Sequence, residues 1–214
     1  MTLVLHSYWR ATAPYRVRIG LNLKGLAYDY VGVNLVTGAQ HESAYAALNP
    51  QGLTPALVTD EGQVLTQSLA ILEWLEETHP SPPLLPREAA DRAVVRAMAG
   101  IVACDIHPLN NLRIQRQLTA LGVDDAGRTT WTQRWINDGF GALEAMVARH
   151  GRGFAFGEAP TLADCLLVPQ VYSAERYKVD LAPYPAIRAA AERAAEHPAF
   201  AAAHPDRQPD ATPA

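Results

Sequence analysis

The chain has 214 residues, of which 49% are hydrophobic and 19% charged, and its formal net charge is −4. This composition is ordinary for a globular protein, and the length suffices for one large domain or two smaller ones. Dispersed basic residues, no apolar run of membrane-spanning length and no signal-peptide pattern at the start argue against nucleic-acid and membrane partners. The cysteines Cys104 and Cys165 lie far apart, which argues against a metal site or disulfide framework and favours the reducing cytoplasm.

The first 80 residues are predicted to form an α/β domain. Apolar alternation and turn residues predict strands at 2–6, 28–35, 56–59 and 63–66, and helices at 14–24, 42–48 and 68–79. Ser68 is predicted to cap the last of these helices, and Glu73 and Glu76 to lie on its exposed side. The order β-α-β-α-β-β-α implies a mixed sheet with helices on its faces.

Residues 7–21 join the first strand to the first helix, and Pro14 falls in the first turn of that helix. Proline suits a first turn because the amide hydrogen that it lacks would have no partner there. The remaining unpaired N–H groups and the positive end of the helix dipole favour an anion. The sequence therefore predicts an anion-binding loop at this position.

Residues 81–86 are a proline-rich linker, and residues 87–214 are predicted to be all-helical. One long helix runs through residues 94–112, with a bend expected at Pro108, and a second runs from Asp125 to His150. Thr161 and Asp164 form a variant capping box for a third helix. A last helix begins near Pro185, and the tail from His204 is expected to fray.

Several short segments resemble the soluble glutathione transferases, and within them the zeta class, which includes maleylacetoacetate and maleylpyruvate isomerases. These segments are 7–10, 16–19, 47–50, 67–71, 104–111, 161–164 and 169–181, and they span nearly the whole chain in the family's order. The resemblance implies a thioredoxin-like N-terminal domain, an all-α C-terminal domain, glutathione as cofactor and a homodimer.

The resemblance also assigns the glutathione contacts. A cis peptide bond between Thr54 and Pro55 would direct the backbone of Thr54 toward the cysteinyl main chain of glutathione, although an ordinary trans turn is the alternative. Gln67 and Ser68 would bind the γ-glutamyl group. Gln40 matches the contact to the glycyl end, although the neighbouring His41 is an alternative.

The thiol position departs from the family pattern. Zeta proteins usually have Ser-Ser-Cys after the arginine of the first loop, whereas this chain has Ala11, Thr12 and Ala13. Thr12 carries the one hydroxyl among the three, and we expect it to donate a hydrogen bond to the glutathione sulfur. Such a bond, together with the helix N-terminus, would raise the thiolate fraction. The alternative is that Thr12 faces away and backbone amides or a water act instead.

Three arginines indicate an acidic substrate. In related maleylpyruvate isomerases, arginines at the positions of Arg10, Arg113 and Arg176 bind the substrate carboxylates, which suits guanidinium geometry. For any single arginine, a surface ion pair is the alternative. His107 and Asn111 are four residues apart and are expected on one helix face, His107 near the substrate and Asn111 toward a carboxylate or glutathione. His107 could equally pack at a kink.

The resemblance thus implies glutathione-dependent cis–trans isomerisation of a small dicarboxylic keto acid, maleylpyruvate or maleylacetoacetate, in aromatic catabolism. Thr12, Arg10 and Arg176 are the expected catalytic residues. Two alternatives stay open. A broader zeta-type transferase or dehalogenase would consume glutathione, and a non-catalytic glutathione-binding protein would fit the missing hydroxyl at Ala11.

Overall fold

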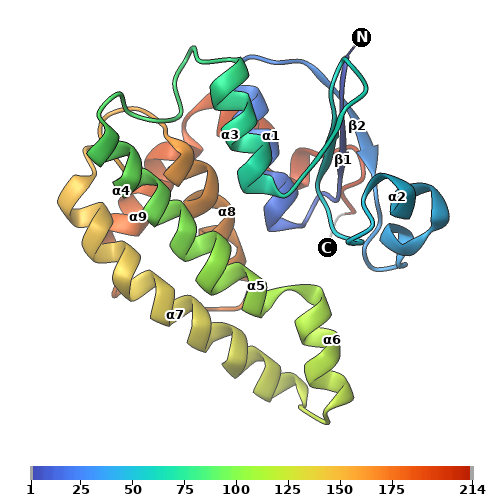
Figure 1. Cartoon of the computed structure of the whole chain (residues 1–214). Coiled ribbons are helices and arrows are strands. Elements are labelled where there is room, and N and C mark those ends of the chain that lie inside the picture. Colours follow the sequence, from blue (N-terminus) through green and yellow to red (C-terminus); the bar gives the residue numbers. More distant parts are fainter. Residues whose placement is uncertain (1, 213–214) are drawn as a thin grey trace. The chain divides into compact units, whose positions relative to one another are not determined.

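The computed structural model describes residues 2–212, which form two compact units. Residues up to Leu84, together with the segment from Glu196 onward, make the first unit, and Leu85–Ala195 makes the second. Figure 1 shows the elements of each unit. Among the described residues, no helix is both long and apolar enough to cross a membrane.

A four-stranded mixed sheet in the order β2-β1-β3-β4 forms the centre of the first unit. Strands β1 (Leu3–Ser7) and β2 (Tyr28–Gly32) pair in parallel, whereas β3 (Ala56–Val58) pairs with β1 and β4 (Val64–Thr66) in antiparallel fashion. The predicted β-α-β-α-β-β-α order is confirmed. Strand β2 ends three residues earlier than expected, after Gly32.

The helices of the first unit are α1 (Thr12–Leu23), α2 (Ser43–Leu48, after the 3₁₀ turn η1 at Ala39–His41) and α3 (Ser68–Thr78). Helices α1 and α3 pack closely at Gly20, where an added Cβ would lie 2.3 Å from the side chain of Leu72. Gly25 follows α1 with a φ of 67°, the left-handed conformation expected of a glycine at a helix end.

The second unit is entirely helical. Its helices are α4 (Ala89–Gly100), the π-helix η2 (Ile101–Ile106), α5 (His107–Asn110), α6 (Leu112–Ala120), α7 (Asp125–His150), α8 (Leu162–Arg176) and α9 (Pro185–Ala195). In Figure 1, α7 runs beside η2 and α5, with which it makes contacts. The predicted single helix through residues 94–112 therefore contains a π segment and ends at Asn110.

The C-terminal segment differs from both predictions made for it. We expected it to belong to the helical domain and to fray from His204, but α10 (Pro198–Ala203) packs against α1 of the first unit. The 3₁₀ turn η3 (Pro205–Arg207) follows, and the buried Gln208 donates from Nε2 to the carbonyls of Ala202 and His204. These contacts order the segment to the end of the described residues.

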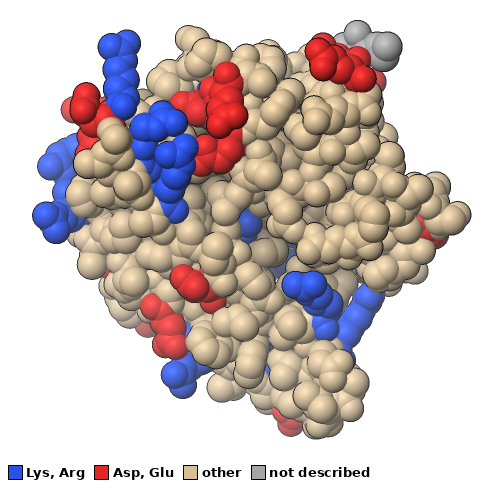
Figure 2. Space-filling view, in the orientation of Figure 1, with Lys and Arg blue, Asp and Glu red and all other residues tan. Residues whose placement is uncertain are grey.

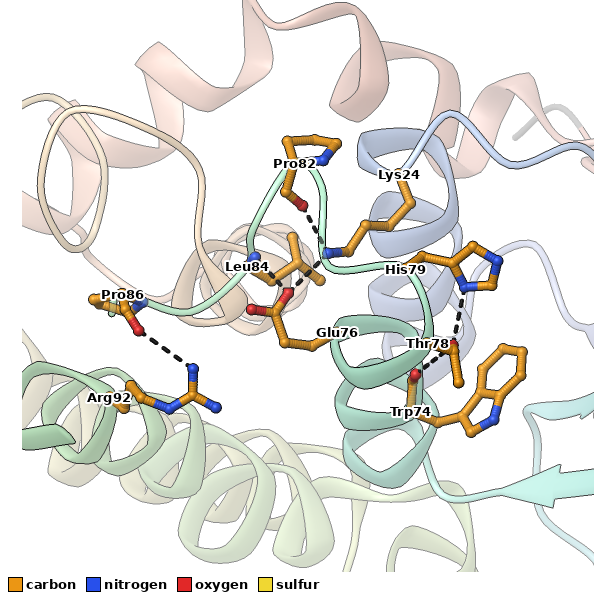
Figure 3. A network of polar contacts seen from close by, with 9 residues as sticks. All are labelled: Lys24, Trp74, Glu76, Thr78, His79, Pro82, Leu84, Pro86 and Arg92. Carbon is orange, nitrogen blue, oxygen red and sulfur yellow. Dashed lines mark hydrogen bonds and ion pairs between the residues drawn. The ribbon is translucent and has the colours of Figure 1, made fainter. Parts of the chain in front are cut away.

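Glu76 is buried rather than exposed, because it takes part in a polar network with the chain that follows α3 (Figure 3). Its Oε2 lies 2.7 Å from Nζ of Lys24 on α1 and accepts a 2.7 Å hydrogen bond from the amide of Leu84. Lys24 also donates to the carbonyl of Pro82 at 2.6 Å. The amphipathic pattern could not reveal this partner, because Lys24 lies 52 positions earlier in the sequence.

Replacing Glu76 by alanine leaves the Lys24 ammonium buried without its counter-charge, so we expect a loss of about 3–5 kcal/mol in the free energy of unfolding. Urea denaturation measures this change. Glu77→Ala is the matched control, because Glu77 is exposed on the same helix, and it should change stability by less than about 0.5 kcal/mol. Equal effects of the two substitutions would show that the network does not stabilise the unit.

The capping box predicted at Thr161 and Asp164 is confirmed. The amide and hydroxyl of Thr161 both donate to Oδ2 of Asp164, at 2.8 and 2.9 Å, and the amide of Ala155 donates to Oδ1 at 2.7 Å. Complete burial raises the pKa of Asp164 to about 6, although these hydrogen bonds act in the opposite direction.

This raised pKa predicts a pH-dependent stability. The folded state holds the Asp164 proton more tightly than the unfolded chain, so the contribution of Asp164 is largest below pH 4 and is lost as the pH rises to about 6. Two pKa units correspond to about 3 kcal/mol. The stability advantage of the wild type over Asp164→Asn should therefore shrink across this range in urea titrations. A difference that does not vary with pH would contradict the prediction.

Candidate functional site

The loop predicted to bind an anion lies between β1 and α1. Its backbone turns where the amide of Ala11 donates to the carbonyl of Tyr8 at 3.1 Å, and Ala11 is then the N-cap of α1. No side chain caps this helix, and the first helical residue, Thr12, is buried. The N-terminus of α1 thus has the first-turn N–H groups, without a side-chain cap, on which the predicted anion site depends.

Arg10 lies on the same loop and is exposed. Its guanidinium carbon is 5.6 Å from the ring centre of Trp9, a cation–π distance. Trp9 itself is buried. A buried ring beneath the guanidinium gives Arg10 a preferred direction while its charge stays accessible.

Ser68 is the first residue of α3 rather than its N-cap. The cap position belongs to Gln67, whose φ of 68° and ψ of 117° are unusual for a residue with a side chain. Such conformations cost about 1–3 kcal/mol and concentrate at functional sites. The Gln67 side chain donates to Oε1 of Gln51 at 2.6 Å. The prediction of Ser68 as a cap is therefore wrong, because the chain enters α3 one residue earlier.

The buried arginine Arg16 lies beside Ser68, and its Nη1 donates to Oγ of Ser68 at 3.2 Å. A guanidinium at a helix N-terminus without a side-chain cap is an arrangement that suits a carboxylate. Arg16 lies in the family motif at residues 16–19, and its sequence context did not assign it to the site. Its position among the apolar residues of a helix could have indicated a role, since a buried arginine needs a polar or charged partner.

The peptide bond between Thr54 and Pro55 is cis, as predicted. It lies directly before β3, and the preceding carbonyl, of Leu53, accepts hydrogen bonds from Tyr45 and Asn49, each at 2.6 Å. The backbone on the N-terminal side of the cis bond is therefore held in place.

Gln40 and His41 lie in the 3₁₀ turn η1. Gln40 is buried, and its Nε2 is 3.1 Å from Nε2 of His41, which is exposed. The His41 ring also lies next to Gly52, where Nδ1 would be 3.0 Å from an added Cβ. The turn is thus placed beside the segment that leads to Thr54.

The strand register brings the predicted glutathione contacts to one end of the sheet. His6 of β1 pairs with Ala56 of β3, and Ala56 pairs with Thr66 of β4. The loop before Thr12, the cis bond at Pro55 and the start of α3 all adjoin these paired residues. This end of the sheet offers main-chain groups, a helix N-terminus and a buried arginine. Such a set fits an extended thiol tripeptide with a free carboxylate.

The second unit holds the other predicted residues. Arg113 is exposed near the start of α6, and Arg176 is exposed at the end of α8. The guanidinium carbon of Arg176 lies 5.7 Å and 5.9 Å from the ring centres of Tyr172 and Tyr177. His107 is the first residue of α5.

Asn111 does not share a helix face with His107, contrary to the prediction. The chain leaves the helix at Asn111, whose φ of −62° and ψ of 149° are extended. Its Oδ1 accepts from the amide of Arg113 at 3.1 Å, so Asn111 is the N-cap of α6. Spacing alone predicted a continuous helix, but an asparagine three residues after Pro108 is a strong cap.

Two family models match the chain. The model described as "Glutathione S-transferase, N-terminal domain" matches residues 13–78, and "Glutathione S-transferase, C-terminal domain" matches residues 129–201. A solved zeta-class structure, described as the holo form of a bacterial maleylpyruvate isomerase, is 49% identical with a TM-score of 0.95 and covers 98% of this chain and 100% of its own. The chain belongs to the zeta class of the glutathione S-transferase family.

Other members of the family show comparable similarity. A maleylpyruvate isomerase of Ralstonia sp is 51% identical over 210 residues, 96% of this chain and 98% of its own. A maleylacetoacetate isomerase of Anaeromyxobacter dehalogenans, solved with glutathione in its active site, is 47% identical with a TM-score of 0.90, over 99% of this chain and 98% of its own. The resemblance and the fold inferred from sequence are thereby confirmed.

Figure 2 shows the charge on one face of the molecule. Most of that face is uncharged, and its Lys and Arg side chains occur in small separate groups, several beside Asp or Glu. On that face, therefore, the positive charge is confined to individual basic side chains rather than forming a broad positive field.

Proposed function

We propose that this chain catalyses the glutathione-dependent cis–trans isomerisation of a maleyl keto acid, maleylpyruvate or maleylacetoacetate, to its fumaryl form. The full-length likeness to the Ralstonia maleylpyruvate isomerase, at 51% identity, carries this proposal. The solved relative with glutathione in its active site supports glutathione as the cofactor.

The first unit would hold glutathione at the end of the sheet marked by His6, Ala56 and Thr66. The backbone of Thr54 would pair with the cysteinyl main chain, as an added strand does. Gln67, Ser68 and the N-terminus of α3 would bind the γ-glutamyl carboxylate. Arg16, which donates a hydrogen bond to Ser68, would add a nearby positive charge. Gln40 would contact the glycyl end. Asn111 would contact a substrate carboxylate or glutathione through Nδ2, because its Oδ1 accepts the capping bond of α6.

When bound, glutathione supplies a thiolate that adds reversibly to the cis double bond, which permits rotation, and that is then released unchanged. Thr12 would donate a hydrogen bond to the sulfur and favour its ionised form, together with the N-terminus of α1. Arg10, Arg113 and Arg176 would bind substrate carboxylates and stabilise the developing enolate charge, with His107 near the substrate.

We also propose that the protein is a cytoplasmic homodimer. The family resemblance supports the dimer, and two free thiols, one of them exposed at Cys104, are compatible with a reducing compartment. Light scattering coupled to size exclusion would test the dimer, for which the expected mass is twice the 23.2 kDa of one chain.

The experiment that tests the proposed activity follows maleylpyruvate and maleylacetoacetate by NMR with limiting glutathione. Conversion to the fumaryl product with glutathione retained supports the isomerase. Glutathione consumption with a small haloacid but no isomerisation would instead support the broader transferase or dehalogenase. Glutathione binding without either reaction would support the non-catalytic alternative, which the missing hydroxyl at Ala11 favours.

A further inference from the structure

The C-terminal segment reaches the loop that carries Arg10 and leads to Thr12, the first residue of α1. Oδ2 of Asp210 accepts a 3.2 Å hydrogen bond from the backbone amide of Trp9. Oδ1 of the same carboxylate accepts a 2.6 Å hydrogen bond from the hydroxyl of Tyr30 on β2. Asp210 therefore connects the loop to the sheet, although it lies 201 positions after Trp9 in the sequence.

A buried arginine binds the other backbone polar group of the same residue. Nη2 of Arg18 donates to the carbonyl of Trp9 at 2.9 Å, and Nη1 donates to Oγ of Ser7 at 3.1 Å. Nε of Arg18 donates to the carbonyl of Ala203 in α10 at 3.0 Å. Both polar backbone groups of Trp9 are thus fixed, one by the C-terminal segment and one by an arginine that binds that segment.

The positive charge of Arg18 lies near the carboxylate of Asp210 and the hydroxyl of Tyr30. Burial lowers the pKa of Arg18, whereas the surrounding acidic groups, which include Tyr30 and Asp210, raise it. Burial raises the pKa of Tyr30, and the hydrogen bond to Asp210 acts in the same direction, so the hydroxyl keeps the proton that it donates. Loss of Asp210 would leave the Trp9 amide and the Tyr30 hydroxyl without this acceptor, with less negative charge near Arg18.

We propose that Asp210 is a positioning residue for the glutathione thiol, acting through the backbone of Trp9. Arg10 and Thr12 follow Trp9 by one and three residues, so the orientation of the Trp9 peptide sets where the loop and the N-terminus of α1 begin. Small displacements of such groups weaken stabilisation of an anion strongly. This inference rests on the proposed function, because it assigns Asp210 a role toward the same thiol.

The test compares Asp210→Ala with Asp206→Ala. Asp206 is an exposed acid in the same segment, so its loss changes the net charge equally without touching the loop. Hydrogen exchange of the Trp9 amide in the protein alone should be about tenfold faster in Asp210→Ala and unchanged in the control. The thiol pKa of bound glutathione, read from thiolate absorbance, should rise by about one unit in Asp210→Ala alone.

Binding of S-methylglutathione separates positioning from general damage. This probe has no ionisable thiol, so its affinity depends on the γ-glutamyl and main-chain contacts and should stay within about twofold of the wild type. Tyr30→Phe is the second variant should Asp210→Ala fold poorly. It keeps the bond to Trp9 but removes the hydroxyl that orients the carboxylate, and it should raise the thiol pKa by about half as much.

A folded variant with faster exchange at Trp9 but an unchanged thiol pKa would overturn the inference, and so would an unchanged exchange rate. Failure of the proposed function has a different signature. A wild type that binds glutathione with a lowered thiol pKa but does not isomerise either keto acid would overturn that function and leave the role of Asp210 standing.

Discussion

Arg176→Ala is expected to lower kcat/KM for maleylpyruvate by about 10²- to 10³-fold. A guanidinium can bind a carboxylate through two parallel charge-assisted hydrogen bonds, and alanine removes both. The two tyrosine rings near the guanidinium of Arg176 limit its directions, which lowers the entropic cost of that contact. Glutathione affinity should stay within about twofold, because Arg176 is assigned to the substrate carboxylates and not to glutathione.

Two further variants sharpen this result. Arg176→Lys keeps the charge but loses the paired geometry, so it should recover only part of the lost kcat/KM. Arg188→Ala removes an arginine of α9 whose Nη2 lies 3.9 Å from Oε1 of Glu192. This variant should leave kcat/KM unchanged. Equal losses of glutathione binding and substrate use in Arg176→Ala would contradict the carboxylate-binding role.

Thr12→Ala is expected to lower kcat/KM by about 10²-fold, the effect of removing one donor from a developing or full anion. In the binary complex it should raise the thiol pKa of glutathione by about one unit. The N-terminus of α1 would remain and account for the residual activity. Spectrophotometric titration of the thiolate in the complex measures the pKa directly.

Thr12→Ser is the matched control, since it keeps the hydroxyl and removes only a methyl group. It should retain a thiol pKa close to that of the wild type. An unchanged pKa in Thr12→Ala would remove Thr12 from the mechanism and transfer its role to backbone amides or a water at the loop.

Local patterns predicted most of the fold, whereas the glutathione contacts were assigned from the family resemblance. Alternating strands, the glycine after α1 and the Thr161–Asp164 capping box are determined by residues close in sequence, and all are present. The cis bond at Pro55 followed from the family motif. Strand pairing explains why the predicted glutathione contacts lie at one end of the sheet, because it joins His6, Ala56 and Thr66 in one row.

The failed predictions concern partners that are remote in sequence or compete locally. Glu76 is buried because Lys24 pairs with it, and the C-terminal segment is ordered because Arg18 and Trp9 bind it. The hydrophobic periodicity of a segment does not show which remote residues will pair with it. Asn111 illustrates local competition, since its capping bond to the amide of Arg113 replaces a further turn of helix.

The most direct test of the account is the number of turnovers per glutathione. Maleylpyruvate in large excess over both enzyme and glutathione is followed by ultraviolet absorbance and NMR, while free thiol is counted before and after. The account predicts complete conversion to fumarylpyruvate, dependence on glutathione and an unchanged thiol count. Thiol loss in proportion to product, or no conversion of either maleyl keto acid despite glutathione binding, would contradict it.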